Sequence, residues 1–172
     1  MELLDIYNEN REKTGRTINR DDSGQLKPGE YIAVGGALLI NPNGQILLSK
    51  RSMTKPSHPG LWELNGGCYQ AGEEGNEAIV REVREEIGVN LDPKKGALLK
   101  TAQLDKFFKD LWAFRIDADI SDLTFDTREV AEAKWASIEE LISLRQNGAM
   151  IDSNEVSIQD YQRALEFLNI KC

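Results

Sequence analysis

Histidine and cysteine are scarce in this chain of 172 residues. Histidine occurs once, as His58, and cysteine twice, as Cys68 and Cys172. Two cysteines imply no disulfide framework, which fits a reducing cytosol, and one histidine is too few for a histidine-rich metal cluster. No apolar stretch approaches the ~20 residues that a membrane-spanning helix needs. These absences exclude a disulfide-stabilised secreted domain and a helical membrane protein.

An excess of positive charge is also missing. The net charge of −8 disfavours non-specific binding to nucleic acid polymers and to anionic membranes. The N-terminal stretch MELLDIYNENREK has no basic region followed by an apolar run, so it does not resemble a secretory signal. We therefore expect a cytoplasmic location, with no nucleic acid partner and no membrane partner.

Length and composition fit a single domain, which we place over residues 1–172. Residues 1–30 are polar with scattered apolar positions, and we expect a short strand or hairpin extension there. The apolar patterns predict strands over 31–40, 45–51, 61–67, 96–104, 106–120 and 132–137, and helices over 75–87, 137–148 and 157–170. This order of strands, helix, strands, helix and helix predicts an α/β fold, with helices packed on a mixed sheet.

The predicted helix over 75–87 carries Glu82, Glu85 and Glu86 at the spacing i, i+3, i+4. Like charges at i, i+4 repel by roughly 0.2–0.5 kcal/mol per pair, and carboxylates near a helix C-terminus oppose the macrodipole. The three carboxylates flank the apolar stripe of the helix, where a cleft could form. The arrangement is either a solvated acidic face or a site whose ligand offsets the repulsion.

A glycine-rich loop precedes this helix. The stretches NGG, over 65–67, and AGEEG, over 71–75, bring several glycines and Glu73 close to the three carboxylates in sequence. Glycine lets the backbone approach a ligand closely and present its N–H groups. Mg²⁺ prefers oxygen ligands, typically carboxylates together with substrate phosphates. Carboxylates beside such a loop therefore predict a site for a metal ion and a diphosphate.

The same stretch resembles the Nudix box. That pattern runs Gly, five residues, Glu, seven residues, Arg-Glu, an aliphatic residue, any residue, Glu-Glu, any residue, Gly and an aliphatic residue. All nine constrained positions match: Gly67, Glu73, Arg81, Glu82, Val83, Glu85, Glu86, Gly88 and Val89. The flanking segments 46–67 and 131–141 are similar to the same family. Residues 4–20 resemble a bacterial branch grouped with isopentenyl-diphosphate isomerase-like members.

The resemblance implies a Nudix hydrolase with an α/β/α sandwich, in which a mixed sheet lies between helices. Such enzymes use Mg²⁺ or Mn²⁺ to cleave a diphosphate linked to another moiety, usually a nucleoside. The resemblance makes Glu82, Glu85 and Glu86, together with Gly67, the metal ligands. It counts Glu82, Glu85 and Arg81 as catalytic, with Arg81 holding a glutamate in place by a charge-assisted hydrogen bond.

Four positions are expected to support the reaction from the substrate side. The resemblance makes Glu73 a supporting contact to the loop or to the metal shell. Arg51, at the end of a predicted strand, could contact a phosphate, and Gly66 and Gly67 belong to the loop that a diphosphate would approach. We expect a small-molecule diphosphate as the partner of this site.

The general base is expected from another segment, because a metal-bound carboxylate has a depressed pKa. In the family it often comes from a loop before the late Trp-containing strand. The corresponding loop offers Asp126, Glu129 and Glu132 ahead of Trp135. Spacing favours Glu129, and Glu132 is the first alternative.

Two other functions are alternatives to hydrolysis. Isopentenyl-diphosphate isomerases use a cysteine directly before the first glycine of the box and a histidine-rich metal site. Here that position is Gly66, Cys68 comes two residues late, and His58 is alone. A non-catalytic, ligand-sensing Nudix domain usually has a degraded box, and this box is intact. Hydrolysis is therefore the prediction, with the substrate set by loops outside the box and a homodimer left open.

Overall fold

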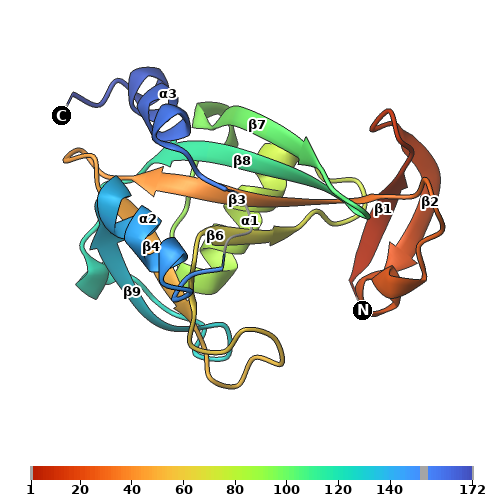
Figure 1. The fold of residues 1–172 in the computed structure, drawn as a ribbon, viewed down its shortest axis with the longest axis horizontal. Helices are drawn as coiled ribbons and strands as arrows, with labels where there is room; N and C mark the ends of the chain where they lie inside the picture. Colours follow the sequence, from red (N-terminus) through yellow and green to blue (C-terminus); the bar gives the residue numbers. More distant parts are fainter. Residues whose placement is uncertain (1, 152–154, 172) are drawn as a thin grey trace.

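The computed structural model describes residues 2–151 and 155–171 as two β-sheets and three α-helices (Figure 1). The larger sheet has seven strands: β3 (Ile32–Ile40), β4 (Ile46–Arg51), β5 (Trp62–Glu63), β6 (Asn65–Cys68), β7 (Ala97–Gln103), β8 (Phe107–Arg115) and β9 (Val130–Ala136). The smaller sheet pairs β1 (Leu3–Tyr7) with β2 (Lys13–Asn19). The helices are α1 (Gly75–Ile87), α2 (Ile138–Gln146) and α3 (Ile158–Leu168). The predicted α/β class is confirmed.

Strand β3 is the centre of the larger sheet. It pairs in parallel with β8 and antiparallel with β4 and β6, so the sheet is mixed, as predicted. The turn between β3 and β4 is closed by Asn41, whose Oδ1 accepts hydrogen bonds from the N–H groups of Asn43 and Gln45 at 3.0 and 2.9 Å. Gly44 has φ 77° in this turn, a conformation that glycine adopts without strain.

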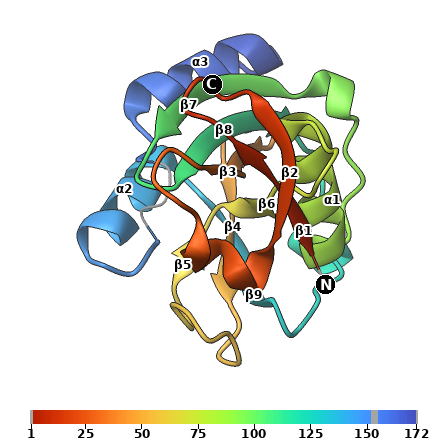
Figure 2. The same cartoon turned by 90° about the vertical axis from the view of Figure 1, so that its right-hand side faces the viewer.

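The seven-stranded sheet lies between two helical layers (Figures 1 and 2). On one face, α1 buries Ile79, Val83 and Ile87 against the sheet. On the other face, α2 and α3 bury Leu141 and Ala164. None of these five side chains is more than 1% exposed, and burying each large aliphatic one stabilises the fold by about 1.5–3 kcal/mol. The predicted α/β/α sandwich is therefore confirmed.

The β1–β2 hairpin stands at one end of the sheet, where Figure 2 shows it facing the viewer. Arg11, between the two strands, forms a bidentate ion pair with Asp110 of β8, whose side chain is 1% exposed. The hydroxyl groups of Thr101 and Tyr69 donate further hydrogen bonds to Asp110, at 2.6 and 2.8 Å. These contacts satisfy the buried carboxylate and fix the hairpin to the sheet.

The single strand predicted over 61–67 is wrong. The segment forms two strands, β5 and β6, that pair with different neighbours: Trp62 lies opposite Lys50 of β4, and Gly66 lies opposite Gly36 of β3. The chain changes partner at Leu64, so neither ladder continues through that residue. This change brings Gly66 and Gly67 beside α1 rather than onto the β4 side of the sheet.

Candidate functional site

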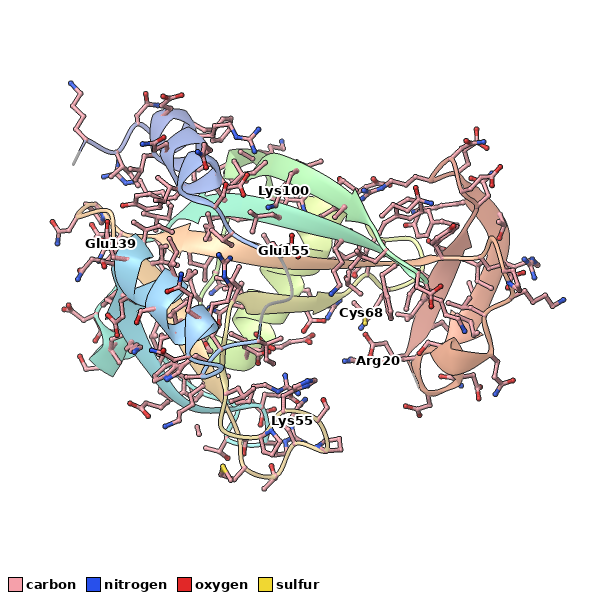
Figure 3. All side chains as sticks on the ribbon, viewed as in Figure 1. Arg20, Lys55, Cys68, Lys100, Glu139 and Glu155 are labelled. Carbon is pink, nitrogen blue, oxygen red and sulfur yellow. The ribbon has the colours of Figure 1, made fainter. Side chains whose placement is uncertain are left out.

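A cleft of about 650 Å³ lies between α1, β6, the N-terminal hairpin and two loops. Its walls are strongly charged. The carboxylates are those of Glu2, Glu82, Glu85, Glu86, Asp126 and Glu129, and the cations are those of Arg20, Arg51, Lys55 and Arg81. Figure 3 shows Arg20 reaching from the hairpin toward Cys68 of β6, with Lys55 on the loop below them. Opposite charges therefore meet in one open cleft, which suits a ligand built from anions and a cation.

Helix α1 presents the box glutamates at the edge of the core. Its apolar stripe is buried, and Gly88 ends it with φ 75° in the left-handed region. Glu82 and Glu86, one turn apart, line the cleft together with Glu85, whose side chain is 53% exposed. The helix begins at Gly75, as predicted, and its N-cap is Glu74, whose N–H donates to Glu77 at 3.1 Å.

Arg81 is the centre of an ion-pair network. It donates to both carboxylate oxygens of Glu73, at 2.7 and 3.0 Å, and to Glu82 at 2.8 Å. It also reaches the Cys68 carbonyl oxygen at 2.9 Å and Glu85 at 3.3 Å. Burial opposes the charge of Arg81, but its hydrogen bonds to the glutamates outweigh burial and raise its pKa. The structure thus brings Glu73, Arg81, Glu82 and Glu85 together and ties the loop over 68–73 to α1.

Glu86 is the carboxylate whose charge is least compensated. Burial, followed by the nearby carboxylates of Glu82, Glu63 and Glu129, raises the pKa of Glu86 well above its usual value. No cationic side chain in the described part of the chain forms an ion pair with it. A partly buried carboxylate among like charges is stabilised by a bound cation, which offsets the repulsion.

The donor set fits a hard divalent cation by its chemistry, since carboxylate oxygens are the ligands that Mg²⁺ and Mn²⁺ prefer. Within residues 2–151 and 155–171, however, no three His, Cys, Asp or Glu side chains are already gathered to hold a metal ion. Glu82 and Glu85 instead both form ion pairs with Arg81, at 2.8 and 3.3 Å.

Gly66 and Gly67 are required by close contacts. At Gly66, where φ is 150°, a Cβ would lie 2.2 Å from the Gly35 carbonyl oxygen. At Gly67 a Cβ would lie 2.5 Å from the carboxyl carbon of Glu82. Both glycines line the cleft. Their bare backbone lets β3 approach Gly66 and the Glu82 carboxylate approach Gly67.

Arg51 lies in the cleft wall but is held by the protein. It donates to Glu63 at 3.0 Å and to the Ser57 carbonyl oxygen at 3.0 Å. Lys55, on the following loop, pairs with Glu129. Both cations are positioned by carboxylates beside the glutamates of α1, so an incoming anion would meet oriented rather than freely moving donors.

The structure separates the three candidate bases. Glu129 and Asp126 line the cleft, and the Asp126 N–H donates to the Glu86 carbonyl oxygen at 3.0 Å, which fixes this loop to α1. Hydrogen bonds from Arg128 lower the pKa of Asp126 to about 2. Glu132 lies on β9, opposite Lys50 of β4, outside the set of residues that line the cleft. The geometry thus favours Glu129, the carboxylate preferred by spacing.

Sequence analysis missed Glu2, Arg20 and Lys55 as cleft residues. Glu2 and Arg20 pair at 2.7 Å, at the end of the hairpin nearest α1. No local pattern marks them, because they reach the cleft only after the hairpin docks. Lys55 had a weak signal: it follows Arg51 by four residues in a loop rich in proline and serine, next to the box.

Comparisons with known proteins give the family. The model of the NUDIX domain matches residues 30–156, so the chain belongs to the Nudix family. An uncharacterized Nudix hydrolase of Listeria monocytogenes is 38% identical over 152 residues, covering 88% of this chain and 89% of that protein. The crystal structure of DR0079 from Deinococcus radiodurans has a TM-score of 0.73 at 28% identity, covering 95% of this chain and 99% of that one.

The likeness to the isomerase branch is partial. An isopentenyl-diphosphate Delta-isomerase of Escherichia coli is 40% identical, but over 57 residues, which are 32% of this chain and 31% of that protein. The relationship to Nudix hydrolases covers most of the chain, whereas the relationship to the isomerase does not. Across the described residues, no helix is both long and apolar enough to cross a membrane.

Proposed function

We propose that the protein is a divalent-metal-dependent hydrolase that cleaves the diphosphate linkage of a nucleoside diphosphate joined to another moiety. The main support is Glu86, a partly buried carboxylate with a raised pKa and no ion-pair partner among the described residues, in a cleft that also holds cations. Carboxylates alone would repel a diphosphate. A metal ion between them and the phosphates, with Arg51 and Lys55 nearby, makes such a site attractive to an anion.

The roles follow from placement. Glu82, Glu85 and Glu86 would hold Mg²⁺ or Mn²⁺, with the Gly67 backbone beside them. When bound, the ion would supply charge neutralisation and a water of lowered pKa. Arg81 positions Glu82 through its hydrogen bond at 2.8 Å, and Glu73 in turn orients Arg81.

Glu129 would accept the proton of the attacking water. The oxygen of that water forms a bond to one phosphorus while the bridging P–O bond breaks, and the other phosphate leaves with the electron pair. The Glu129 carboxylate pairs with Lys55, whose ammonium group could also contact the leaving phosphate. A proton shared between these two groups would balance the negative charge that develops on the leaving group.

The cleft lacks the reactive cysteine and the histidine-rich metal site that an isopentenyl-diphosphate isomerase would need. Cys68 carries a thiol whose pKa is raised by burial, so the thiolate form is disfavoured, and His58 lies on the loop between β4 and β5. We expect no incorporation of deuterium when isopentenyl diphosphate is incubated with the protein in heavy water. Deuterium incorporation that disappears in Cys68→Ser would show that the protein is an isomerase and not a hydrolase.

The direct test is a hydrolysis screen over nucleoside triphosphates, nucleotide sugars, ADP-ribose, dinucleotides and CoA, with Mg²⁺ or Mn²⁺. Release of a phosphorylated product that stops on chelation of the metal is the expected result. A ligand-sensing domain would bind one of these compounds without turnover in the same screen. Cytoplasmic location and a homodimer stay predictions.

A further inference from the structure

The guanidinium group of Arg51, in the wall of the cleft, is held from two sides. Its Nη1 donates to both carboxylate oxygens of Glu63, each at 3.0 Å. Its Nε donates to the Ser57 carbonyl oxygen at 3.0 Å, and its Nη2 donates to the Ser57 hydroxyl oxygen at 3.2 Å. All three nitrogen atoms therefore have acceptors in the protein, which fixes the plane of the group.

The sheet brings Arg51 and Glu63 together. Strands β4 and β5 pair antiparallel, with Ser49 opposite Glu63. Arg51 comes two residues after Ser49, so it is a diagonal neighbour of Glu63 on the same face of the sheet, within reach of a long side chain. The Arg51 N–H also donates to the Leu61 carbonyl oxygen at 2.9 Å, which closes the loop that carries Ser57. Strand register and loop closure thus place both partners of Arg51.

Glu63 acts on the cleft from outside it. Arg51 lines the cleft, whereas Glu63 is not among the residues that line it. Arg51 has five N–H groups, and its four contacts among the described residues use at most four of them. At least one N–H therefore remains for a ligand. Glu63 also has a second route, because its charge adds to burial and to Glu82 in raising the pKa of Glu86.

We propose that Glu63 is a positioning residue: together with Ser57 it sets the plane of the Arg51 guanidinium group, so that Arg51 meets a phosphate in a fixed orientation. The proposal rests on the proposed hydrolase function, which puts a diphosphate beside Arg51. A hydrogen bond weakens steeply as its angle narrows, so the direction of the remaining N–H decides how well it binds a phosphate oxygen. An arginine that is ordered before the ligand arrives also loses less conformational entropy on binding.

The test is binding of methylenediphosphonate, a diphosphate analogue that hydrolysis does not cleave, to the full chain at saturating Mg²⁺. Saturating metal removes any effect of Glu63 on metal affinity through Glu86. Titration calorimetry should show that Glu63→Ala weakens binding about tenfold. Glu63→Gln, which keeps a carbonyl acceptor for Arg51, should weaken it about threefold at most. Glu30→Ala, which breaks a similar pair with Arg16 on the hairpin, is the matched control and should bind like the wild type.

Two arginine variants show whether Glu63 acts through Arg51. Arg51→Met should weaken binding at least as much as Glu63→Ala does, and adding Glu63→Ala to it should cause no further loss. Arg51→Lys keeps the charge but loses the planar fork that Glu63 and Ser57 hold, so it should also weaken binding about tenfold. Arg51→Lys tests the proposal even where thermal unfolding shows that Glu63→Ala does not fold.

Three results would overturn the proposal. Glu63→Gln that weakens binding as much as Glu63→Ala would mean that Glu63 acts by its charge. Arg51→Lys that binds like the wild type would mean that orientation does not matter. Glu63→Ala that lowers only the melting temperature would mean that the pair only holds the loop.

Hydrolysis is measured separately, with the substrates of the screen. Metal-dependent hydrolysis, together with diphosphonate binding that Glu63→Ala leaves unchanged, removes this proposal alone. Binding that depends on Arg51 and Glu63, without hydrolysis of any substrate, removes the proposed function and leaves the positioning of Arg51.

Discussion

The backbone of Gly67 lies directly against the carboxylate of Glu82, so that a Cβ on Gly67 would come within 2.5 Å of both the carboxyl carbon and Oε1. The obstructing atoms are the far end of a flexible side chain. A methyl group there would push the carboxylate aside, whereas at Gly66 it would meet the Gly35 backbone. Two adjacent glycines are thus needed for different reasons, Gly66 for the sheet and Gly67 for the position of Glu82.

We expect Gly67→Ala to lower kcat/KM about tenfold to a hundredfold, because Glu82 moves away from Arg81 and from the metal position. Its melting temperature should stay close to that of the wild type. Gly66→Ala, by contrast, should lower the melting temperature, because two strands must separate. Thermal unfolding and kinetics of both variants check this. A Gly67→Ala variant with wild-type kinetics would show that Glu82 need not hold its present position.

Neutralising Glu85 or Glu86 should lower activity without lowering stability. We expect Glu85→Gln and Glu86→Gln to lower turnover at least about a hundredfold, since each removes an electrostatic contact to the metal. Without metal, Glu86→Gln should be at least as stable as the wild type at pH 7, because it removes a partly buried charge among like charges. Glu166→Gln, on the exposed side of α3, is the matched control. Near wild-type hydrolysis by both variants would disprove the metal site.

If Glu129 is the general base, substitution of Glu129 and of Glu132, three residues apart, should have different effects on turnover. Glu129→Gln should lower kcat about a hundredfold or more at saturating metal, with little change in metal affinity, and should remove the acidic limb of the pH–rate profile. Glu132→Gln should be nearly silent, because Glu132 lies on β9 beside Lys50. The reverse pattern moves the role to Glu132. If both variants are silent, the base is on α1 or in another loop.

The box was predictable because its information is local. The spacing of Glu82, Glu85 and Glu86 on one helix follows from the helical period, and α1 ends at Ile87, as predicted, with Gly88 after it in the left-handed region. The cleft as a whole was not predictable in this way. Arg20 comes from the hairpin and Lys55 from the loop after β4, and only tertiary docking brings them near α1. The interruption between β5 and β6 at Leu64 was not predictable for the same reason, because the choice of strand partner depends on tertiary structure and not on local sequence.

The attachment of the β1–β2 hairpin to the larger sheet should depend on the ion pair between Arg11 and the buried Asp110. Arg11→Met leaves the Asp110 carboxylate, 1% exposed, with hydroxyl donors from Thr101 and Tyr69 but no cation, which costs about 3–5 kcal/mol. The double variant Arg11→Met with Asp110→Asn should recover part of this loss. Urea unfolding of the three proteins checks it. An Arg11→Met variant as stable as the wild type would mean that the hairpin is held by its apolar contacts alone.

The last prediction concerns acid stability and lies far from the cleft. Burial alone would raise the pKa of Asp160 on α3, but hydrogen bonds from Lys100, Ser157 and Arg163 outweigh burial and lower it to about 2. Because the folded-state pKa is lower than the usual 3.8, the folded form binds fewer protons than the unfolded form between these values. This contribution, about 2 kcal/mol, is therefore complete above pH ~4 and is lost as the pH falls toward about 2.

Asp160→Asn should lower the free energy of unfolding by about that amount at pH 7 and by much less near pH 2. Denaturant unfolding at pH 7, 4 and 3 measures the convergence of the two proteins. Asp117→Asn, at an exposed aspartate after β8, is the control and should shift stability little at any of these pH values. A constant gap between Asp160→Asn and the wild type would mean that Asp160 acts through packing and neutral hydrogen bonds. A gap that closes in acid assigns the stabilisation to its charge, through the link from α3 to Lys100 on β7.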